Sequence, residues 1–387
     1  MKKKIAILGS TGSIGKTLFN ILLKEKSNFE ITLLTANKSH KHLLKQAKIF
    51  NVKNLIITNK KNYEILKKET RNTNIQVFND YKYFHKIFKK KIDYTMSSVS
   101  GIEGLKPTLE IIKFTKKIAI ANKESIICGW NLIQSKIKQH KTEFIPVDSE
   151  HFSIWYGLKN YKNTNIEKIF LTASGGPFFK TSLKKFNKIR VSDALKHPNW
   201  KMGKKISTDS ATMINKVYEV IEAKNLFNID YKKIKILIHP KSYIHAILKF
   251  NNGLTNIIAH DTTMKVPIFN TLFTESNRKL KTKDINVNIL NNLNLDNVSS
   301  KRFPMIGLLK FLPNHHSLFE TVIVSANDKL VELFLEEKIK FTDIQKKLFK
   351  LIRKKEFQKF KRKIPKNISD ITNLNNYVRL KIKKNSI

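Results

Sequence analysis

IAILGSTGSIGKTLFNILL (residues 5–23) places a glycine-rich turn between an apolar run and a segment with helical spacing. An apolar strand that ends in glycines and continues as a helix is the opening unit of nucleotide-binding α/β sheets. Backbone N–H groups at the start of such a helix bind phosphate, because they have no partner within the helix. The stretch therefore predicts an α/β domain that binds a phosphate-containing ligand.

The glycine spacing fits two kinds of phosphate-binding loop imperfectly. Gly15–Thr17 matches the end of a P-loop, but that motif requires its first glycine where Ser10 stands. Gly9, Gly12 and Gly15 match a dinucleotide fingerprint with one additional residue between the first two glycines. The dinucleotide interpretation is favoured, and a tight turn without any ligand is the structural alternative.

The end of the next predicted strand distinguishes between the two nicotinamide cofactors. NAD-binding proteins usually place Asp or Glu there, to bind the 2′-hydroxyl of the ribose. The predicted strand FEITLLTA (residues 29–36) is followed instead by Asn37, Lys38 and Ser39. A cation and small hydrogen-bonding groups suit a 2′-phosphate, so this segment favours NADP over NAD.

The order of predicted elements indicates an α/β protein with three domains. Strands alternate with helical patterns through residues 1–149, which predicts a mostly parallel, doubly wound sheet in a Rossmann-like NADP-binding domain. Residues 150–274 are expected to form an α+β catalytic domain. Residues 275–300 are polar and lack periodicity, as in a linker, and residues 301–387 have the apolar spacing of a C-terminal helical domain.

The composition limits the partners and the compartment. The 387-residue chain has a net charge of +44, which by itself suggests nucleic acid or an anionic membrane as a partner. Its lysines are scattered along the chain among many Asn and Ile residues, which share A/T-rich codons, so we expect no nucleic-acid partner.

No apolar run approaches the ~20 residues of a membrane span. The amino terminus reads as a first strand rather than a signal peptide, and the single cysteine, Cys128, indicates a reducing compartment, so we expect a cytoplasmic protein.

Polar residues follow two further predicted strands. ANKES (residues 121–125) sets Asn122, Lys123 and Glu124 at the carboxyl end of a strand, where open α/β sheets bind their ligands. An ordinary turn with solvated charges is the alternative.

The second of these segments, PVDSEH (residues 146–151), carries two carboxylates. Asp148 and Glu150 are two residues apart, and in an extended chain such side chains point to the same side. Carboxylate oxygens are hard ligands of the kind that Mg²⁺ and Mn²⁺ prefer. The pair therefore predicts a metal site, with a solvated strand end as the alternative.

Two loops carry small or apolar residues that suit a binding site. HPNWKMGKKIS (residues 197–207) is interpreted as a mobile lid whose apolar tip contains Trp200. TASGGPF (residues 172–178) is a small-residue loop in which Ser174 can donate to an anion. A packed surface loop and a plain glycine turn are the respective alternatives.

A helix is expected from about Ser210, with polar residues along one face. Asn215, Glu219 and Glu222 follow the i, i+4, i+7 spacing, and Lys216 lies three residues before Glu219. The preceding STDS would then be a phosphate-binding helix start. A solvated salt-bridge face is the ordinary explanation of such a stripe.

Taken together, these motifs resemble the 1-deoxy-D-xylulose 5-phosphate reductoisomerases. GSTGSIG, ANKES, PVDSEH, SGGPF, HPNWKMGKKISTDSATMINK, VIEA and HPKSYIHAI occur in the order of that family between Gly9 and about His245. The resemblance implies a homodimeric enzyme of the methylerythritol phosphate route to isoprenoids. Such an enzyme rearranges its phosphorylated substrate and reduces the product with NADPH, using Mg²⁺ or Mn²⁺, with Co²⁺ as a further candidate.

The resemblance also implies roles for individual residues, grouped here by what they would contact. NADPH would contact Thr11, Gly12, Ser13, Ile14, Asn37, Lys38, Ser39, Asn122, Glu124 and Gly203. The metal ion would be bound by Asp148, Glu150 and Glu219. The substrate would contact Lys123, Ser149, Glu150, Ser174, His197, Ser210, Asn215, Lys216 and Glu219. The catalytic residues would be Lys123, Glu150 and His197.

The sequence departs from the family pattern at several positions. Val217 and Tyr218 stand where Gly and Leu are expected, Asp328 replaces the usual Glu, and Asn37 replaces a more usual Gly. We expect the first three to affect packing, and Asn37 to alter cofactor contacts slightly.

Overall fold

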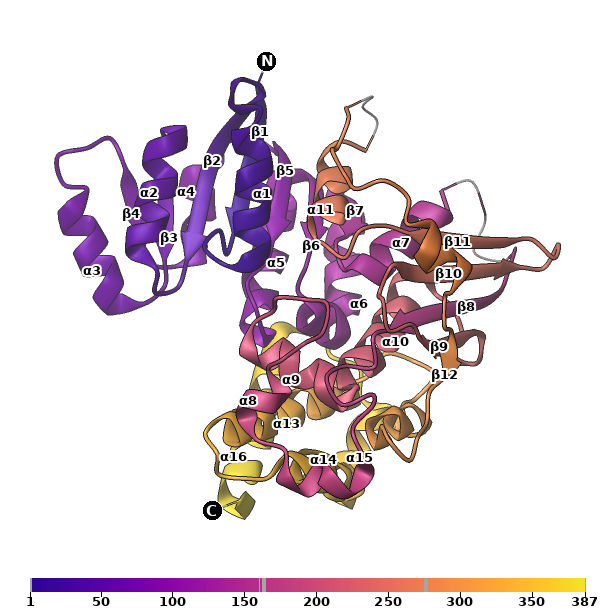
Figure 1. Ribbon diagram of the computed structural model, residues 1–387. Coiled ribbons are helices and arrows are strands. Elements are labelled where there is room, and N and C mark those ends of the chain that lie inside the picture. The colour runs from indigo at the N-terminus through magenta and orange to yellow at the C-terminus, as the bar shows by residue number, and fades with distance from the viewer. Residues whose placement is uncertain (1, 160, 162–164, 275–277, 387) are drawn as a thin grey trace. The chain divides into compact units, whose positions relative to one another are not determined.

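The computed structural model describes residues 2–159, 161, 165–274 and 278–386 (Figure 1). Its contacts group the chain into two compact units. Unit 1 comprises Met1–Ser125, Leu132–Asp148 and Met264–Leu280, and unit 2 comprises Ile126–Asn131, Ser149–Thr263 and Lys281–Ile387. The three-domain division with boundaries after residues 149, 274 and 300 stays a prediction.

Unit 1 is built on a seven-stranded sheet in which all neighbouring strands are parallel. Its strands, in spatial order, are β4 (Gln76–Phe78), β3 (Asn54–Ile57), β2 (Phe29–Ala36), β1 (Lys3–Leu8), β5 (Ile92–Ser97), β6 (Thr115–Ile120) and β7 (Glu143–Pro146). The chain progresses outward from β1 to β4 and then returns to pair β5 with the other side of β1. Ligands of open α/β sheets bind at the carboxyl edge where the winding reverses, so the turn after β1 lies at that point. The predicted parallel sheet is confirmed.

Helices cover this sheet and close its apolar core. They are α1 (Ser13–Leu23), α2 (His40–Phe50), α3 (Lys60–Glu69), α4 (Phe84–Ile87), α5 (Leu105–Ile111), α11 (Lys265–Leu272) and both ends of α6 (Lys123–His140), whose middle, Ile126–Asn131, belongs to unit 2. β1 is buried from Ile5 to Leu8, as expected for a parallel strand with both faces covered. Although α11 is distant in sequence, it packs against α1, which explains why Met264–Leu280 belongs to this unit.

Unit 2 contains a mixed five-stranded sheet. Its strands, in spatial order, are β11 (Thr255–Ala259), β10 (Ile244–Phe250), β8 (Ile166–Ala173), β9 (Ile234–Ile238) and β12 (Asp296–Asn297). Only β8 and β9 pair in parallel. Helices α7 (Ser149–Gly157) and α10 (Ile214–Phe227) pack against this sheet through a core that includes Ile154, Leu171 and Val220.

The remainder of unit 2 is largely helical. Its helices are α8 (Val191–Ala194), α9 (Lys204–Thr212), α12 (Val287–Asn291), α13 (Leu318–Leu335), α14 (Phe341–Ile352), α15 (Lys355–Gln358) and α16 (Ile368–Ser386). α13 is buried along most of its length and contacts α9, α14 and α16. A capping box between Ser317 and Glu320 satisfies backbone donors at its start. The helices predicted near the carboxyl end are therefore present.

The predicted lid and the helix after it differ from the structure. The irregular segment ends at Gly203, because α9 begins at Lys204, so residues 204–207 are helical. Ser210 lies near the end of α9 rather than at a helix start, and the interpretation of STDS as a helix amino terminus is wrong. The chain then turns at Met213, whose φ of 68° is left-handed, and α10 starts at Ile214.

The predicted linker also contains regular structure. Within residues 275–300, Val287–Asn291 form α12 and Asp296–Asn297 form β12, which pairs with β9. Neither element is long enough to show a period in the sequence.

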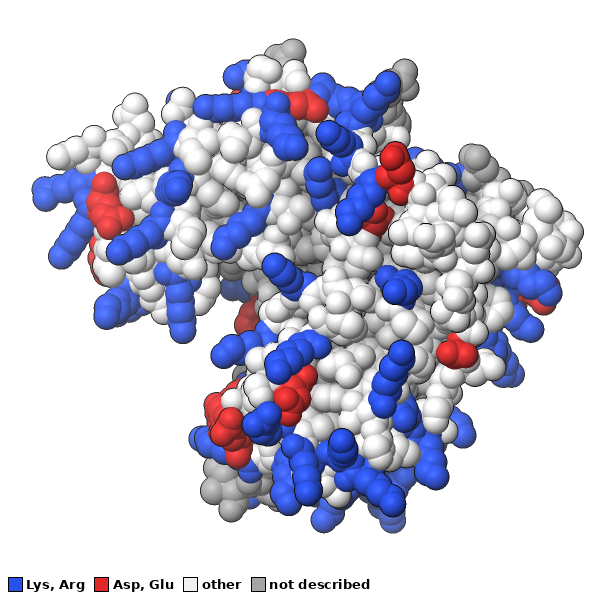
Figure 2. All heavy atoms as spheres, viewed as in Figure 1, with Lys and Arg blue, Asp and Glu red and all other residues white. Residues whose placement is uncertain are grey.

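Charge is distributed over the molecule rather than confined to one stripe. Figure 2 shows lysine and arginine side chains spread over many elements of the visible face, with fewer acidic ones between them. Among the described residues, no helix is long and apolar enough to cross a membrane.

Candidate active site

The glycine-rich turn after β1 presents backbone amides at the start of α1. Gly9 has a left-handed φ of 80°, and the amide of Gly12 donates to its carbonyl at 3.1 Å. A Cβ on Gly15 would lie 2.4 Å from the carbonyl oxygen of Gly9, so only glycine allows the helix to pack this closely. Gly12 caps α1 without a side-chain hydrogen bond, and Ser13 is exposed. These amides therefore fit a bound phosphate, whereas Lys16 is part of the helix through its bond to the Gly12 carbonyl.

The segment between β2 and α2 carries a positive charge and no carboxylate. Asn37, Lys38 and Ser39 are exposed there. The Asn37 amide donates to the Thr58 hydroxyl at 2.7 Å, and Lys38 forms no ion pair with any described residue. The group fits the 2′-phosphate of NADP.

Asn122 holds together two loops at the carboxyl edge of the sheet. Its Oδ1 accepts from the Ser125 amide at 2.6 Å and so caps α6. Its Nδ2 donates to the carbonyls of Val99 and of Gly101, the latter at 2.7 Å. The first turn of α6 places Glu124, which is half-buried, beside this edge.

Lys123 and Asp148 form an ion pair within unit 1. Lys123 is the first residue of α6, and Asp148 follows β7, so both arise from the carboxyl ends of adjacent strands. The side chains are 11% and 18% exposed, which leaves both groups accessible at one edge of the sheet.

Lys216 lies between two carboxylates in unit 2. Its Nζ donates to Glu150 Oε1 at 2.8 Å and also pairs with Glu219, whose other oxygen accepts from the Asn215 amide. Burial alone would lower the pKa of Lys216, but the two carboxylates raise it above its ordinary value. Because Lys216 and Glu219 are almost fully buried, the solvated salt-bridge face is the wrong interpretation. Two carboxylates around one ammonium keep a net negative charge, which suits a divalent cation.

The extended geometry expected for Asp148 and Glu150 is wrong. β7 ends at Pro146 and α7 begins at Ser149, so Glu150 lies in the first turn of a helix. Its Oε2 accepts from the Ser149 hydroxyl at 2.5 Å. Only two residues separate the end of the strand from the start of the helix. The alternation of side chains along a strand therefore does not extend to Glu150.

His151 positions Glu150 and Glu219, although its role was not predicted from the sequence. Its Nε2 lies 2.8 Å from the Glu219 carbonyl oxygen, which can only accept, so this nitrogen donates. Its Nδ1 lies 3.8 Å from Glu222 Oε2, and its ring stacks on Phe227. His151 therefore links α7 to α10 and fixes the relative positions of the two carboxylates. Its only signal in the sequence was its place in PVDSEH.

Ser174 and His197 are brought together in unit 2. His197 Nδ1 accepts from the backbone amides of Asn199 and Trp200, at 3.2 and 3.0 Å. The proton of the neutral ring is therefore on Nε2, which lies 3.1 Å from Ser174 Oγ. Burial, and then the charge of Lys216, lower the pKa of His197 to about 4. His197 is thus a neutral N–H donor near pH 7.

The two glycines after Ser174 bring this loop against α9. Gly175 and Gly176 have left-handed φ values of 81° and 64°. A Cβ on Gly176 would lie 2.9 Å from the Ser210 carbonyl oxygen, so the loop contacts the backbone of α9. The Gly176 amide also donates to Ser174 Oγ at 3.1 Å. The loop that carries Ser174 therefore lies next to Ser210.

The irregular segment after His197 packs against the β9–β10 connection. The Asn199 side-chain amide donates to Ser242 Oγ at 2.9 Å, and the Trp200 ring meets the His245 ring edge-on at 6.3 Å. Gly203 ends the segment as the cap of α9, and nothing lies within 4 Å of the position a Cβ would take. Steric crowding by the described residues therefore does not require glycine at this position.

Three departures from the family pattern are accommodated by packing. Val217 and Tyr218 are buried in α10, with the Lys205 ammonium 5.4 Å from the Tyr218 ring centre. Lys205 also pairs with Asp328 at 3.0 Å and with Asp209 at 2.8 Å.

These features define a class of protein. A parallel sheet with a glycine-rich turn after β1, and with no acidic residue at the end of β2, is typical of an NADP-binding oxidoreductase. Paired carboxylates and converging hydroxyl, imidazole and ammonium groups add a site for a divalent metal and an anionic substrate.

Sequence comparisons identify the family. Sequence profiles of 1-deoxy-D-xylulose 5-phosphate reductoisomerase match residues 5–129, and those of its C-terminal domains match residues 144–227 and 261–381. A 1-deoxy-D-xylulose 5-phosphate reductoisomerase of Pelagibacter ubique (strain HTCC1062) is 59% identical over 387 residues, covering 100% of both chains. One of Wolbachia sp. subsp. Brugia malayi (strain TRS) is 39% identical over 348 residues, covering 89% of this chain and 88% of the other. This chain belongs to the 1-deoxy-D-xylulose 5-phosphate reductoisomerase family.

Solved structures of the family have the same fold. The enzyme from Zymomonas mobilis in complex with NADPH superposes with a TM-score of 0.88 at 30% identity, covering 100% of this chain and 99% of that one. A reductoisomerase in complex with NADPH, fosmidomycin and magnesium superposes with a TM-score of 0.90 at 28% identity, covering 99% and 98%.

Proposed function

We infer that the chain converts 1-deoxy-D-xylulose 5-phosphate into 2-C-methyl-D-erythritol 4-phosphate, a step of isoprenoid biosynthesis, with NADPH and a divalent metal ion. The reaction rearranges the carbon skeleton and then reduces an aldehyde. The observation that carries this inference is the ion-paired group of Glu150, Lys216 and Glu219, in a chain whose other unit has an NADP-type turn. Family members with NADPH, fosmidomycin and magnesium bound support it.

The cofactor would be held along the carboxyl edge of the unit 1 sheet. The turn from Thr11 to Ile14, where α1 starts without a side-chain cap, would bind the pyrophosphate. Lys38, with Asn37 and Ser39, would bind the 2′-phosphate, because an ammonium without an ion-pair partner is available there. Asn122 and Glu124 would meet the cofactor from the neighbouring strand end, and Gly203 from the start of α9.

The metal ion would be held by Asp148, Glu150 and Glu219, whose oxygens are the hard ligands that Mg²⁺ and Mn²⁺ prefer. When bound, the ion withdraws electrons from the oxygens of an α-hydroxyketone. His151 keeps α7 and α10 in place by its bond to the Glu219 carbonyl. Lys216 pairs with Glu150 and with Glu219 and so holds their carboxylates close together.

The substrate phosphate would be bound by Ser174, Ser210, Asn215 and Lys216, with the Nε2–H of His197 as a further donor. Neutral His197 donates from Nε2 whatever the pH between about 5 and 8, because its pKa is lowered to about 4. Several donors that share one phosphate fix the position of the sugar carbons before reaction.

Two residues would act on the reacting atoms, and one segment would shield them from water. Glu150 is placed to take and return a proton, because Ser149 and Lys216 both donate to its carboxylate and hold it in one orientation. Lys123 would offset negative charge that develops on oxygen. Movement of the segment around Trp200 over the substrate would exclude water before hydride transfer.

We also propose that the chain forms a homodimer through β11. This strand is at the edge of the unit 2 sheet, so one side of its backbone has no strand partner among the described residues. Ile257 on the strand is 51% exposed, and Leu254 just before it is 55% exposed. A second copy of the strand would bury these side chains and pair the free backbone edge.

We also propose a cytoplasmic location. Its support is the single cysteine, Cys128, which is buried, and the use of NADPH, the reductant of biosynthesis in that compartment.

The direct test is NADPH oxidation by the purified protein with 1-deoxy-D-xylulose 5-phosphate, with Mg²⁺ and after chelation. We expect absorbance at the nicotinamide band to fall only when both substrate and metal are present, and much more slowly with NADH. A folded sample that leaves NADPH unchanged under these conditions would refute the proposed function.

A further inference from the structure

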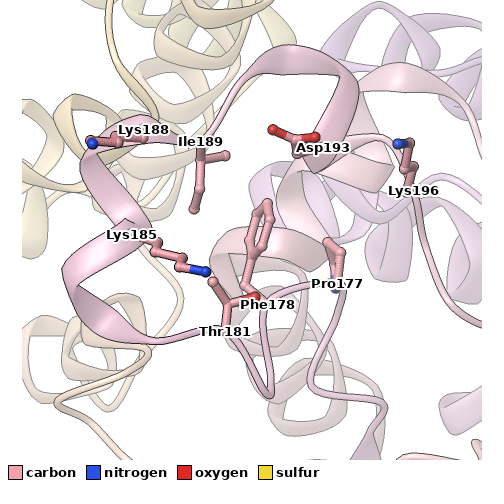
Figure 3. A pocket seen from close by; sticks show the side chains of 8 residues that line it. All are labelled: Pro177, Phe178, Thr181, Lys185, Lys188, Ile189, Asp193 and Lys196. Carbon is pink, nitrogen blue, oxygen red and sulfur yellow. The ribbon is translucent and has the colours of Figure 1, made fainter.

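Unit 2 contains a cavity of about 520 Å³ that is formed by residues with no role in the site above (Figure 3). All of its lining comes from one stretch, residues 177–196. Three lysines contribute, Lys185, Lys188 and Lys196, and an apolar wall is made by Pro177, Phe178 and Ile189. The cavity thus combines positive charge with an apolar surface.

The lining of this cavity carries more positive than negative charge. Among described residues, none forms an ion pair with Lys185, Lys188 or Lys196. The one acidic residue of the lining is Asp193, and its Oδ2 accepts from the backbone amide of Arg190 at 3.1 Å and from its Nε at 3.4 Å. Figure 3 shows the Lys185 ammonium directed toward Thr181 and Phe178, with Lys188 and Lys196 on opposite sides of the cavity. Three ammonium groups against a carboxylate that is already paired attract an anion.

The apolar wall is held in place by packing behind it. Phe178 is 4% exposed and meets Phe341 edge-on at 5.1 Å, with Phe186 at 6.0 Å. Arg302 donates to the Phe178 carbonyl at 2.9 Å and to the Thr181 carbonyl at 2.5 Å. These bonds engage two carbonyl oxygens of the lining segment, which would otherwise repel an anion. The site is consequently built before any ligand arrives, which lowers the cost of binding.

The lining segment connects two residues that we assign to the substrate phosphate. It begins after the Gly175–Gly176 turn that follows Ser174, and it ends at Lys196, next to His197. Ser174 and His197 contact each other at 3.1 Å, so the two ends of the segment meet. A molecule bound in the cavity would contact the segment that carries both.

We propose that this cavity binds an organic phosphate that carries a short apolar chain, at a site separate from the catalytic one. The phosphate is bound by Lys185, while Lys188 and Lys196 add positive charge from opposite sides of the cavity, and the apolar chain lies on Phe178 and Ile189. The position relative to the substrate phosphate rests on the proposed function, but binding itself requires neither NADPH nor turnover, so the two can fail independently.

The test is calorimetric titration of the full-length protein with hexyl phosphate, methyl phosphate and hexanol. We expect hexyl phosphate to bind at least tenfold more tightly than methyl phosphate, and hexanol not to bind measurably, because both the charge and the chain contribute. Equal affinity for the two phosphates would overturn the apolar part of the proposal.

Matched variants locate the site. The triple variant Lys185→Gln, Lys188→Gln, Lys196→Gln should lose at least tenfold in affinity for hexyl phosphate. The control Lys180→Gln, Lys184→Gln, Lys232→Gln removes the same charge from exposed lysines outside the lining and should bind as the unaltered protein does. Equal losses in both would indicate only general attraction to a cationic surface and would refute the site.

A third variant separates the cavity from the substrate site. Ser174→Ala should leave the affinity for hexyl phosphate within about twofold. If Ser174→Ala abolishes binding and the cavity triple variant does not, hexyl phosphate binds at the substrate-phosphate position and the proposal is wrong.

Discussion

The Asn327 side-chain amide donates to Asp209 Oδ1 at 2.8 Å, across 118 residues of sequence. Both side chains are fully buried, and the bond joins α13 to α9. Asp209 immediately precedes Ser210, and Lys205 pairs with the other oxygen of its carboxylate. The helix that follows the predicted lid and carries a proposed phosphate ligand is therefore fixed to the longest buried helix of unit 2.

Replacing Asn327 with Ala should destabilise the protein by about 2 kcal/mol, because Asp209 would lose a donor in a buried place. Urea unfolding followed by circular dichroism measures the change. Asn376→Ala, on an exposed face of α16, is the control and should alter the free energy of unfolding by less than about 0.5 kcal/mol. A loss at Asn327 no larger than in this control would show that the bond contributes nothing to stability.

Replacing Glu219 with Gln should lower kcat by about 100-fold or more while the fold is retained, because it removes one negative charge from the metal ligands. The second readout is the rise in melting temperature on adding Mg²⁺, which we expect in the unaltered protein and not in the variant. Glu69→Gln, at an exposed position of α3, should keep both properties. An undiminished Mg²⁺ effect in the Glu219 variant would remove this residue from the metal site.

Replacing Lys38 with Ala should raise the KM for NADPH by about tenfold, the effect of losing one charge-assisted hydrogen bond. The KM for the sugar phosphate and the affinity for NADH should stay unchanged, because neither involves a 2′-phosphate. Lys41→Ala, at an exposed position of α2, is the matched control. Equal changes for NADPH and NADH would argue against Lys38 as the 2′-phosphate ligand.

His197 should make the protein less stable as the solution is acidified. Its pKa of about 4 in the folded protein is below the ordinary value of 6.5, so between these values the unfolded chain binds more protons. The stability due to this group is complete above pH 6.5 and is lost as the pH falls toward 4. Urea midpoints at pH 7 and pH 5 should differ more for the unaltered protein than for His197→Gln. Equal differences would show that His197 does not titrate as its surroundings require.

Ile257→Glu should convert the proposed dimer into monomers, because a charge would be buried in the contact between two β11 strands. Sedimentation equilibrium measures the mass directly. Leu380→Glu introduces the same charge at an exposed position of α16 and should leave the mass unchanged. If the Ile257 variant stays dimeric, or the unaltered protein is monomeric, the proposed interface is wrong.

Local signals were sufficient to predict the first sheet and the polar face of α10. The strands are apolar runs bounded by turn residues, and the face of α10 follows the helical period of Asn215, Lys216 and Glu219. The period could not reveal that this face is buried. Its burial depends on α7, which His151 attaches to the Glu219 carbonyl from 68 residues away in the sequence.

Other features had no local signal to predict them. The break between α9 and α10 occurs at Met213, a residue type that rarely adopts a left-handed φ, so the sequence reads as one continuous helix there. β12 is formed by two residues and exists because β9 is available to pair with it. The bond between Asp209 and Asn327 likewise depends on the tertiary packing of two helices.

The ammonium of Lys216 gives the paired carboxylates a counter-ion that belongs to the polypeptide itself. Two buried carboxylates with no cation beside them would repel each other and oppose folding. Because their partner is covalently part of the chain, this centre can assemble during synthesis whatever the supply of Mg²⁺ in the cell. If Glu150 and Glu219 bind the metal ion as proposed, the cell can load, exchange or withdraw it without having to refold the protein.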